Sequence, residues 1–437
     1  DGISLAMVVL TALLAAVAVI ASWEALSGGR SKEYAILLLF LEGGVIGSFL
    51  SLDLILFFAF WEAMLVPAYL MVGVCGGVHR IYAAYKFFLY TAIGSLLMLV
   101  GIIWVYAVHS AQTGVPTFDA IELAKTPISA DYQTWAFLAF ALAFAIKVPI
   151  FPLHTWLPDL YTEMPLGAMV LVTMLVKVGA YGFLRFAIPL FPAAAVAYAP
   201  LLAGLGVVGI IYAGLSAFVQ ADLVRVVAFS SIAHLGFIVL GIFALTHQSV
   251  EGAVVQMFNH GISAGALFLV AGVIQARTGS TEFSRLGGLG MKWPIIATFG
   301  LVAMLSSVGL PGLNGFIGEF LIIVGSYASL LPYAVIASVG IVIAAVYLLS
   351  MYRQAMHGPE IPNLVGPDLS GREALAFAPL VVLVVVLGIY PAPLLGVLEG
   401  SIDQVTRVTA EVRTIPSYGL GLVEWPSLAL IDENAWK

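Results

Sequence analysis

The sequence predicts an all-α polytopic membrane protein, and three observations support this fold class. Hydrophobic residues make up 62% of the 437 residues and charged residues only 9%, whereas a soluble domain usually carries about a quarter charged residues. The apolar residues come in runs of roughly 18 to 27, a length that crosses a ~30 Å hydrocarbon core. Short polar breaks separate these runs. The pattern excludes a soluble enzyme.

The composition also limits the chemistry that the chain can carry. The formal net charge is −7 without a cluster of Lys or Arg, so we expect no nucleic-acid partner. The single cysteine, Cys75, excludes an internal disulfide and any iron–sulfur site made of several cysteines. No His/Cys/Asp/Glu spacing suggests a metal site, and no glycine-rich phosphate loop follows a strand pattern. We therefore expect no metal and no cofactor on this chain.

The apolar segments predict twelve visible transmembrane helices when 293–330 is counted as a single broken helix. In order they lie at 2–22, 34–51, 53–74, 81–107, 134–152, 164–190, 197–219, 223–246, 250–276, 293–330, 332–355 and 374–396. The loop 108–133 and the tail 397–437 are the only sizeable pieces expected outside the membrane. Neither is large enough for a separate catalytic domain.

Two of these helices carry strong helix-breaking signals. The tenth contains the run Gly309-Leu310-Pro311-Gly312-Leu313-Asn314-Gly315, and the fifth is followed closely by Pro149, Pro152 and Pro158. Irregular backbone is tolerated at membrane depth only where protein buries it or where it lines a wet cavity. Both breaks are therefore expected to be buried within protein or to line a wet cavity.

The positions of the breaks predict two inverted five-helix repeats, each with one broken helix. The second to sixth helices form one group, 34–190, and the seventh to eleventh form another, 197–355. The broken helix is the fourth in each group, and an odd number of helices makes the second group enter the membrane from the opposite side. The residues outside the repeats are an N-terminal helix and loop, 1–33, and a C-terminal helix with an outer tail, 374–437.

Lysine and arginine in the loops predict the orientation. One side collects most of them and is expected to be cytoplasmic; they are Arg30, Lys32, Arg80, Lys86, Arg225, Arg277, Arg285, Lys292, Arg353 and Arg372. Asp1 and the tail after 396 are then expected outside. The chain opens directly into an apolar helix, without an initiator Met or a basic leader, so we also expect further helices upstream.

Several ionisable residues fall at membrane depth, where each charge costs roughly 2.5–3.5 kcal/mol by insertion scales. The main candidates are Glu62, Lys147, Lys177, His234, His260 and Glu319, with Glu42 and His154 as secondary ones. The simpler interpretation is a set of ion pairs that lock helix to helix. Packed apolar residues often replace such pairs without loss of stability, so this interpretation explains the whole set poorly.

A proton relay explains the set better. Burial disfavours the charged form of a lysine and a nearby carboxylate restores it, so moving or protonating the carboxylate releases a proton. Neutral histidine accepts on one ring nitrogen and donates from the other, which suits a link in a proton path. His154 lies beside the first break, where capping freed backbone groups is an alternative to a relay role.

Several stretches together resemble one family, the antiporter-like membrane chains of respiratory complex I, the proton-translocating NADH:quinone oxidoreductase. The resemblance is strongest to the type called M in bacteria and 4 in mitochondria, and it runs from Asp1 to Pro391. Its most specific pieces are Phe60-Trp61-Glu62 with Pro67, Ala145–Pro149 through His154–Asp159, Leu175–Gly182, Phe229–Gly236, Asn259-His260-Gly261 and Gly309–Phe320.

The resemblance implies roles for the buried charges. Glu62 would pair with Lys147, the central proton-exchanging lysine; Lys177 would connect sideways. His234 and His260 would bridge toward Glu319, where the sister type L would carry Lys. The family has fourteen helices, which implies that the first two are absent here.

The resemblance also implies a setting. The chain would be a non-redox subunit of the oxidoreductase in a bacterial inner membrane, with both visible termini on the periplasmic side. Sister antiporter-like chains and other membrane subunits would be its partners in the bilayer. Quinone, flavin and iron–sulfur clusters would belong to other subunits. The alternatives are a subunit of a multi-subunit sodium/proton antiporter and a passive membrane scaffold, and the scaffold leaves the mid-membrane lysines unexplained.

Overall fold

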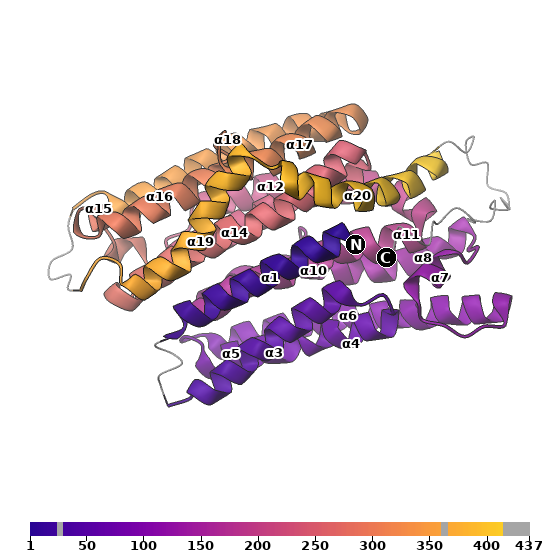
Figure 1. Cartoon of the computed structure of the whole chain (residues 1–437), viewed down its shortest axis with the longest axis horizontal. Coiled ribbons are helices and arrows are strands. Elements are labelled where there is room, and N and C mark those ends of the chain that lie inside the picture. Colours follow the sequence, from indigo (N-terminus) through magenta and orange to yellow (C-terminus); the bar gives the residue numbers. More distant parts are fainter. Residues whose placement is uncertain (24–28, 360–365, 414–437) are drawn as a thin grey trace.

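The computed structural model describes residues 1–23, 29–359 and 366–413, most of which lie in helices that run side by side (Figure 1). In chain order these are α1 (Gly2–Ala21), α3 (Ser31–Leu50), α4 (Leu54–Ala63), α5 (Leu65–Cys75), α6 (Arg80–Thr113), α7 (Ala120–Ala124), α8 (Ala130–Lys147), α9 (Trp156–Glu163), α10 (Leu166–Gly182), the π-helix η1 (Phe183–Ala187), α11 (Ile188–Leu190), α12 (Pro192–Phe218), α13 (Leu223–Ala244), α14 (His247–Thr278), the 3-10 helix η2 (Phe283–Arg285), α15 (Leu289–Lys292), α16 (Pro294–Val308), α17 (Asn314–Ser329), α18 (Leu331–Met356), α19 (Gly371–Ile389) and α20 (Ala392–Arg413).

Ten helical stretches within the described residues are long and apolar enough to cross a membrane, by length and composition. They correspond to ten of the twelve predicted segments. The other two are 134–152 and 293–330, the segments with helix-breaking signals. There the chain forms the shorter helices α8 and α9, and α16 and α17.

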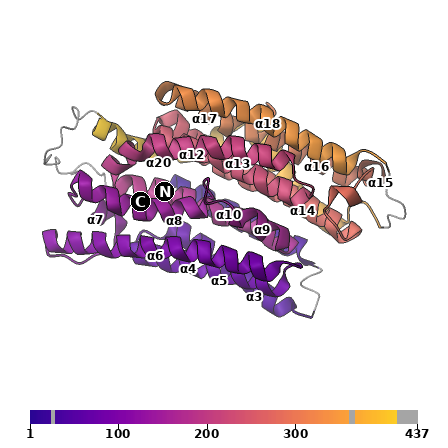
Figure 2. The ribbon, with the colours of Figure 1, turned by 180° about the vertical axis from the view of Figure 1, so that it is seen from behind.

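Three long helices form the buried centre of the bundle. Nearly every side chain of α10, α13 and α14 is buried, whereas α6, α12 and α18 expose many large apolar side chains. The helices α3 to α6 lie along one flank and α16 to α18 along the other, a division visible in Figure 1 and from behind in Figure 2. Ionisable side chains in the middle of α10, α13 and α14 are thus shielded from the surroundings on both flanks.

The chain leaves the helical conformation between α8 and α9. Pro149 has no N–H to continue the ladder and its ring blocks the preceding turn, so α8 ends at Lys147. The carbonyl groups at a helix end need new donors. Trp156, the first residue of α9, supplies one, because its indole Nε1 donates to the Ile146 carbonyl at 2.9 Å.

A second departure separates α16 from α17. Gly309 and Gly312 have φ of +81° and +93°, a left-handed conformation that favours glycine over residues with a Cβ. Leu310, between them, is 42% exposed. This irregular segment therefore reaches the outer surface of the chain.

The C-terminal part differs from the predicted single helix and open tail. The helix α19 ends at Ile389, and Ala392–Arg413 forms the further helix α20, which packs against α1, α12 and α14. Its apolar residues Leu398, Ile402 and Val405 are buried. The tail was misjudged because charged residues interrupt its apolar pattern. The rest of the predicted tail, 414–437, lies outside the described residues.

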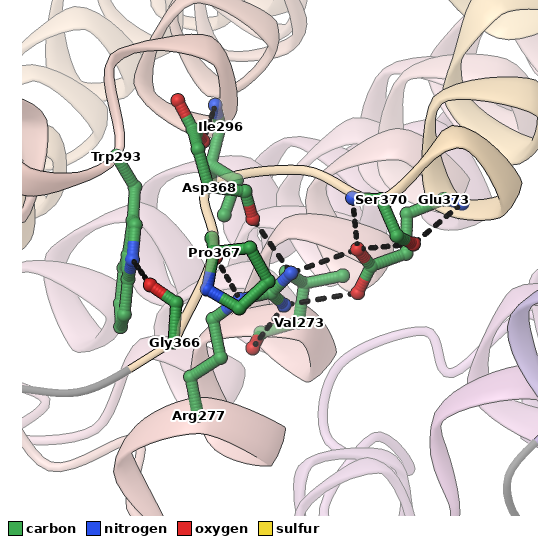
Figure 3. A network of polar contacts seen from close by, with 9 residues as sticks. All are labelled: Val273, Arg277, Trp293, Ile296, Gly366, Pro367, Asp368, Ser370 and Glu373. Carbon is green, nitrogen blue, oxygen red and sulfur yellow. Dashed lines mark hydrogen bonds and ion pairs between the residues drawn. The ribbon is translucent and has the colours of Figure 1, made fainter.

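A polar network fastens α19 to the end of α14 (Figure 3). The guanidinium of Arg277 donates to both carboxylate oxygens of Glu373, at 2.9 and 2.7 Å, and to the Asp368 carbonyl at 2.6 Å. The carboxylate of Asp368 in turn accepts from the backbone N–H groups of Ile295 and Ile296 at the start of α16. One arginine thus ties three helices together.

Candidate functional site

Lys147 is buried without a hydrogen-bonding partner. Its side chain ends α8 and is 1% exposed, and Nζ has no hydrogen-bond partner among the described residues. The nitrogen lies 4.7 Å from the ring centroid of Trp61 on α4, a cation–π distance. Glu62, the next residue, forms neither a hydrogen bond nor an ion pair with Lys147 Nζ in the described part of the chain.

The close approach of α8 to α10 depends on Gly179. A Cβ at this position would lie 3.0 Å from Lys147 Cβ and 2.9 Å from the Phe144 carbonyl oxygen. Only a residue without a side chain lets the two helices pack at this distance. Lys177 lies two residues earlier on α10, so the backbones that carry the two lysines are neighbours.

Lys177 meets His260 in the buried centre. The distance from Lys177 Nζ to His260 Nδ1 is 2.7 Å, and the two side chains come from α10 and α14. Lys177 is fully buried and His260 is 4% exposed. The other ring nitrogen of His260, Nε2, has no partner among the described side chains and backbone groups.

His234 meets Glu319 in the same region. His234 Nδ1 on α13 lies 2.6 Å from Glu319 Oε1 on α17, and Gln256 Nε2 on α14 donates to the same oxygen at 2.9 Å. His234 and His260 have ring centroids 5.6 Å apart. The structure therefore brings four predicted residues into one cluster, which we call the α10–α17 cluster: Lys177, His260, His234 and Glu319.

The two secondary candidates lie apart from this cluster. Glu42 on α3 is partly exposed, and among the described residues no hydrogen bond or ion pair joins it to the cluster. His154 lies between α8 and α9, 3% exposed, with its ring against Phe151 and Tyr212. Its Nδ1 has no partner in the described part of the chain.

A second buried network holds the segment before α17. Asn314 Oδ1 accepts from Ser306 Oγ at 2.5 Å, and Ser306 Oγ lies 2.6 Å from Ser263 Oγ. Asn259 Nδ2 donates to the Asn314 carbonyl at 2.7 Å. Because Asn259 precedes His260, these contacts fix α14 against α16 and α17 beside the cluster.

Two residues of the site were not among the candidates from the sequence, Gln256 and Trp61. Gln256 stands one helical turn before His260, so its spacing on α14 was the signal that it faces the same region. Trp61 precedes the candidate Glu62, and its ring contacts Lys147 Nζ. No cluster of three or more His, Cys, Asp or Glu side chains that could hold a metal occurs among the described residues.

Comparisons with known proteins agree with one another. A family model described as NADH:quinone oxidoreductase/Mrp antiporter, transmembrane, matches residues 51–344. NADH-quinone oxidoreductase subunit M of Pseudomonas aeruginosa is 42% identical over 414 residues, which cover 93% of this chain and 81% of that protein.

Solved structures extend this likeness to the fold. A chain of respiratory complex I from Thermus thermophilus with bound NADH has a TM-score of 0.86 and 35% identity, and the match covers 94% of this chain and 85% of that one. A chain of the Mrp complex from Dietzia sp. has a TM-score of 0.82, with 94% and 85% covered. Its identity is only 22%, so that likeness concerns the fold alone.

Proposed function

Because this chain belongs to the family of antiporter-like membrane subunits of NADH:quinone oxidoreductase, respiratory complex I, and within it to the M type, we propose that it carries protons across the membrane while other subunits carry the electrons. The observation that carries the proposal is the α10–α17 cluster. It is a buried set of hydrogen-bonded ionisable side chains on four different helices.

The contacts suit proton exchange between neighbours. At 2.7 Å, a proton can move from Lys177 Nζ to His260 Nδ1 while His260 releases its Nε2 proton on the other side of the ring. His234 can pass a proton to Glu319 in the same way across 2.6 Å. The unpartnered Nε2 atoms of the two histidines leave room for water to join the two pairs.

Lys147 and Glu62 form the first half of the proposed relay. The aromatic face of Trp61 stabilises a charged Lys147 without fixing it by a hydrogen bond. A movement that brings the Glu62 carboxylate closer to Lys147 would stabilise the protonated lysine. A movement that separates the two side chains would release the proton from Lys147 toward Lys177. Glu42 and His154 are proposed only as secondary members.

The proposal includes the architecture of two inverted repeats. In the helices from α3 to α10 and in those from α12 to α18, the fourth unit is an interrupted pair, α8 with α9 and α16 with α17. A shorter break at Met64, between α4 and α5, falls in the second unit of the first group. Counting each interrupted pair as one span gives the twelve spans expected here, with fourteen in the family. With the basic loops in the cytoplasm, Asp1 and the described residues after 396, up to Arg413, lie on the periplasmic side of a bacterial inner membrane.

Partners are proposed from the segment between α16 and α17. Residues 310–312 are exposed and not helical, and irregular backbone facing lipid would leave peptide groups without partners. A neighbouring membrane subunit, such as a sister antiporter-like chain, is expected to cover them. Quinone, flavin and iron–sulfur clusters are assigned to other subunits, and this chain performs no redox step.

The antiporter alternative shares the fold but has less support. The Mrp chain is similar in structure at 22% identity, whereas the oxidoreductase relatives reach about twice that value. Copurification separates the two alternatives, since flavin and iron–sulfur subunits accompany the oxidoreductase. Sodium-dependent exchange without those subunits would favour the antiporter.

The direct test is the loss of Lys147 or Glu62. We expect Lys147→Ala and Glu62→Gln to leave the complex assembled and to lower NADH-driven proton pumping in vesicles by roughly tenfold or more, since a positioned proton-transfer group contributes about 10² or more to a rate. Lys125→Ala is the control, because Lys125 lies outside the membrane segments and contacts Glu122 in a surface pair. Wild-type pumping in either variant would contradict the relay.

A further inference from the structure

Two buried hydroxyl groups lie beside the α10–α17 cluster but have no place in the relay described above. The phenol oxygen of Tyr347 on α18 is 2.9 Å from Ser230 Oγ on α13. Tyr347 is 1% exposed and Ser230 is 2% exposed. A buried tyrosine hydroxyl needs a partner, and here the partner is another hydroxyl that itself can donate or accept.

The pair is close to both members of the His234–Glu319 contact. Ser230 lies four residues before His234 on α13, one helical turn away on the same face. Tyr347 lies on α18, which packs against α17, the helix that carries Glu319. Ser231, also on this turn, is buried with no partner for its hydroxyl among the described residues, as is His234 Nε2. Both atoms are polar groups that an ordered water could bind.

The pair also lies on one particular side of the cluster. Ser230 is nearer than His234 to the start of α13, where Arg225 donates to Asp159 at 3.2 Å. Tyr347 lies in the second half of α18, which ends at Met356 shortly after Arg353. Both helix ends belong to the basic side of the chain. The hydroxyl pair therefore stands between this side and Glu319.

We propose that Tyr347 and Ser230 form a hydroxyl branch that passes protons between the basic side of the chain and the His234–Glu319 contact. The branch rests on the proposed relay and connects the basic side of the chain with its Glu319 end, in series with the Lys147 end, so that the loss of either part lowers pumping. Each hydroxyl oxygen accepts a proton and releases its own, so neither residue changes its net charge. The proton that enters at Tyr347 leaves from Ser230 to His234 or Glu319.

The test uses the assembled complex in proteoliposomes, with NADH-driven pumping as the readout. Tyr347→Phe keeps the ring and removes one oxygen, and Ser230→Ala removes the other hydroxyl. We expect each to lower pumping by roughly fivefold, less than the full contribution of a proton-transfer group because water can replace part of the path. Ser230→Thr keeps a hydroxyl and is expected to restore pumping to within about twofold of wild type.

The matched control is Tyr352→Phe. Tyr352 lies on the same helix, but its hydroxyl donates to the Ala297 carbonyl at 3.0 Å, a bond that only fixes structure. We expect wild-type pumping from this variant. The solvent isotope effect provides the second readout, because a weakened proton step makes pumping in D2O relatively slower for Tyr347→Phe, whereas a packing defect lowers both rates alike.

The outcomes separate the branch from the relay. Glu319→Gln serves as the reference: if it pumps normally, the proposed function itself is wrong. If Glu319→Gln loses pumping while Tyr347→Phe and Ser230→Ala retain it, the relay stands and the branch is wrong. Equal losses in Tyr347→Phe and Tyr352→Phe, with an unchanged isotope effect, would also overturn the branch.

Discussion

At the scale of single residues, the site is defined by which ionisable groups have found a partner. Lys177 and Glu319 each contact a histidine within 2.7 Å. Lys147 instead contacts an aromatic face. A hydrogen bond fixes the direction in which a proton moves, whereas the ring does not. The two ends of the proposed relay therefore hold their protons by different physical means.

The Lys177–His260 contact predicts an asymmetry between its two partners. Lys177→Met keeps an apolar chain of similar length but leaves His260 Nδ1, a neutral acceptor, without its partner, which costs about 1–3 kcal/mol. His260→Ala leaves the Lys177 amine, a group that can carry a charge, without its partner and also opens a cavity, so it costs more. We expect both variants to lose pumping.

Thermal dissociation of the complex, followed by native electrophoresis, checks this asymmetry. The His260→Ala complex is expected to dissociate at a lower temperature than the Lys177→Met complex. The reverse order, or retained pumping in Lys177→Met, would show that the contact is only structural.

The sequence was sufficient to predict that Lys147, Lys177 and Glu319 are buried, but not how they pair. Glu42 and Glu62, expected at the same depth, are partly exposed. Lys147, Lys177 and Glu319 stood out because charges inside apolar runs are rare. Their partners depend on side-chain directions and on the packing of helices distant in sequence. For that reason the expected Lys147–Glu62 ion pair is replaced by a contact with Trp61, and Gln256 was not foreseen. His109, in the stretch 108–133 that was expected to be a loop outside the membrane, is buried on α6 and contacts Thr126.

At the scale of helices, glycine decides how closely the elements approach. Gly179 lets α10 pack against the end of α8, and Gly318 lies against Gln256 on α14, where a Cβ would meet the amide oxygen at 2.5 Å. The helix ends follow recognisable signals, such as the mutual capping of Ser370 and Glu373 at α19. Helix breaks were therefore easier to predict than close helix–helix contacts. Proline interrupts its own helix, whereas a glycine at a helix contact matters only because of the residue that packs against it from another helix.

We expect Gly179→Ala to lower proton pumping by displacing Lys147, although Gly179 itself carries no ionisable group. The added methyl would meet Val148 Cγ2 at 2.7 Å and the Phe144 carbonyl at 2.9 Å, so the end of α8 must shift and Lys147 must shift with it. Overpacking of this kind costs about 1–3 kcal/mol. Pumping in vesicles is expected to fall more than assembly does.

Gly209→Ala is the matched control on α12. Among the described residues, no atom outside the neighbouring turns of α12 lies within 4 Å of a Cβ at Gly209, and alanine favours a helix over glycine by roughly 1 kcal/mol. This variant is expected to pump normally and to be no less stable. Equal behaviour of the two alanine variants would refute the close-approach argument.

At the scale of the whole molecule, polar ties between distant segments hold the two flanks on the central helices. Asp159 on α9 accepts from Lys86 on α6 and from Arg225 on α13. Arg277 joins α14, α16 and α19 at the same basic side (Figure 3). Such long-range ties were not predictable from the sequence, since surface loops and partly buried clusters share the same residue types. The helix α20 was not predicted because charged residues interrupt its apolar pattern.

Replacing Arg277 by lysine tests these ties. Lysine cannot reproduce the bidentate contact with Glu373 or reach the Asp368 carbonyl at the same time. Since Arg277 and Glu373 are only 11% and 17% exposed, we expect Arg277→Lys to destabilise the chain by about 1–3 kcal/mol.

Arg285→Lys is the control for that change. Arg285 pairs with Glu282 at 3.6 Å with both side chains largely exposed, so its loss is expected to be near 0–1 kcal/mol. Resistance of the assembled complex to heating is the measurement. A loss in Arg285→Lys as large as in Arg277→Lys would show that the network is not a special tie.

The contact between Lys147 and Trp61 has an optical consequence. A unit charge 4.7 Å from the centre of an indole ring exerts a strong local field on it in a region of low dielectric constant. Such a field shifts the absorption and emission wavelengths of the ring. Each gain or loss of a proton at Lys147 would therefore shift the ultraviolet absorption and the fluorescence of Trp61. The chain thus carries a built-in electrochromic reporter of the charge on Lys147.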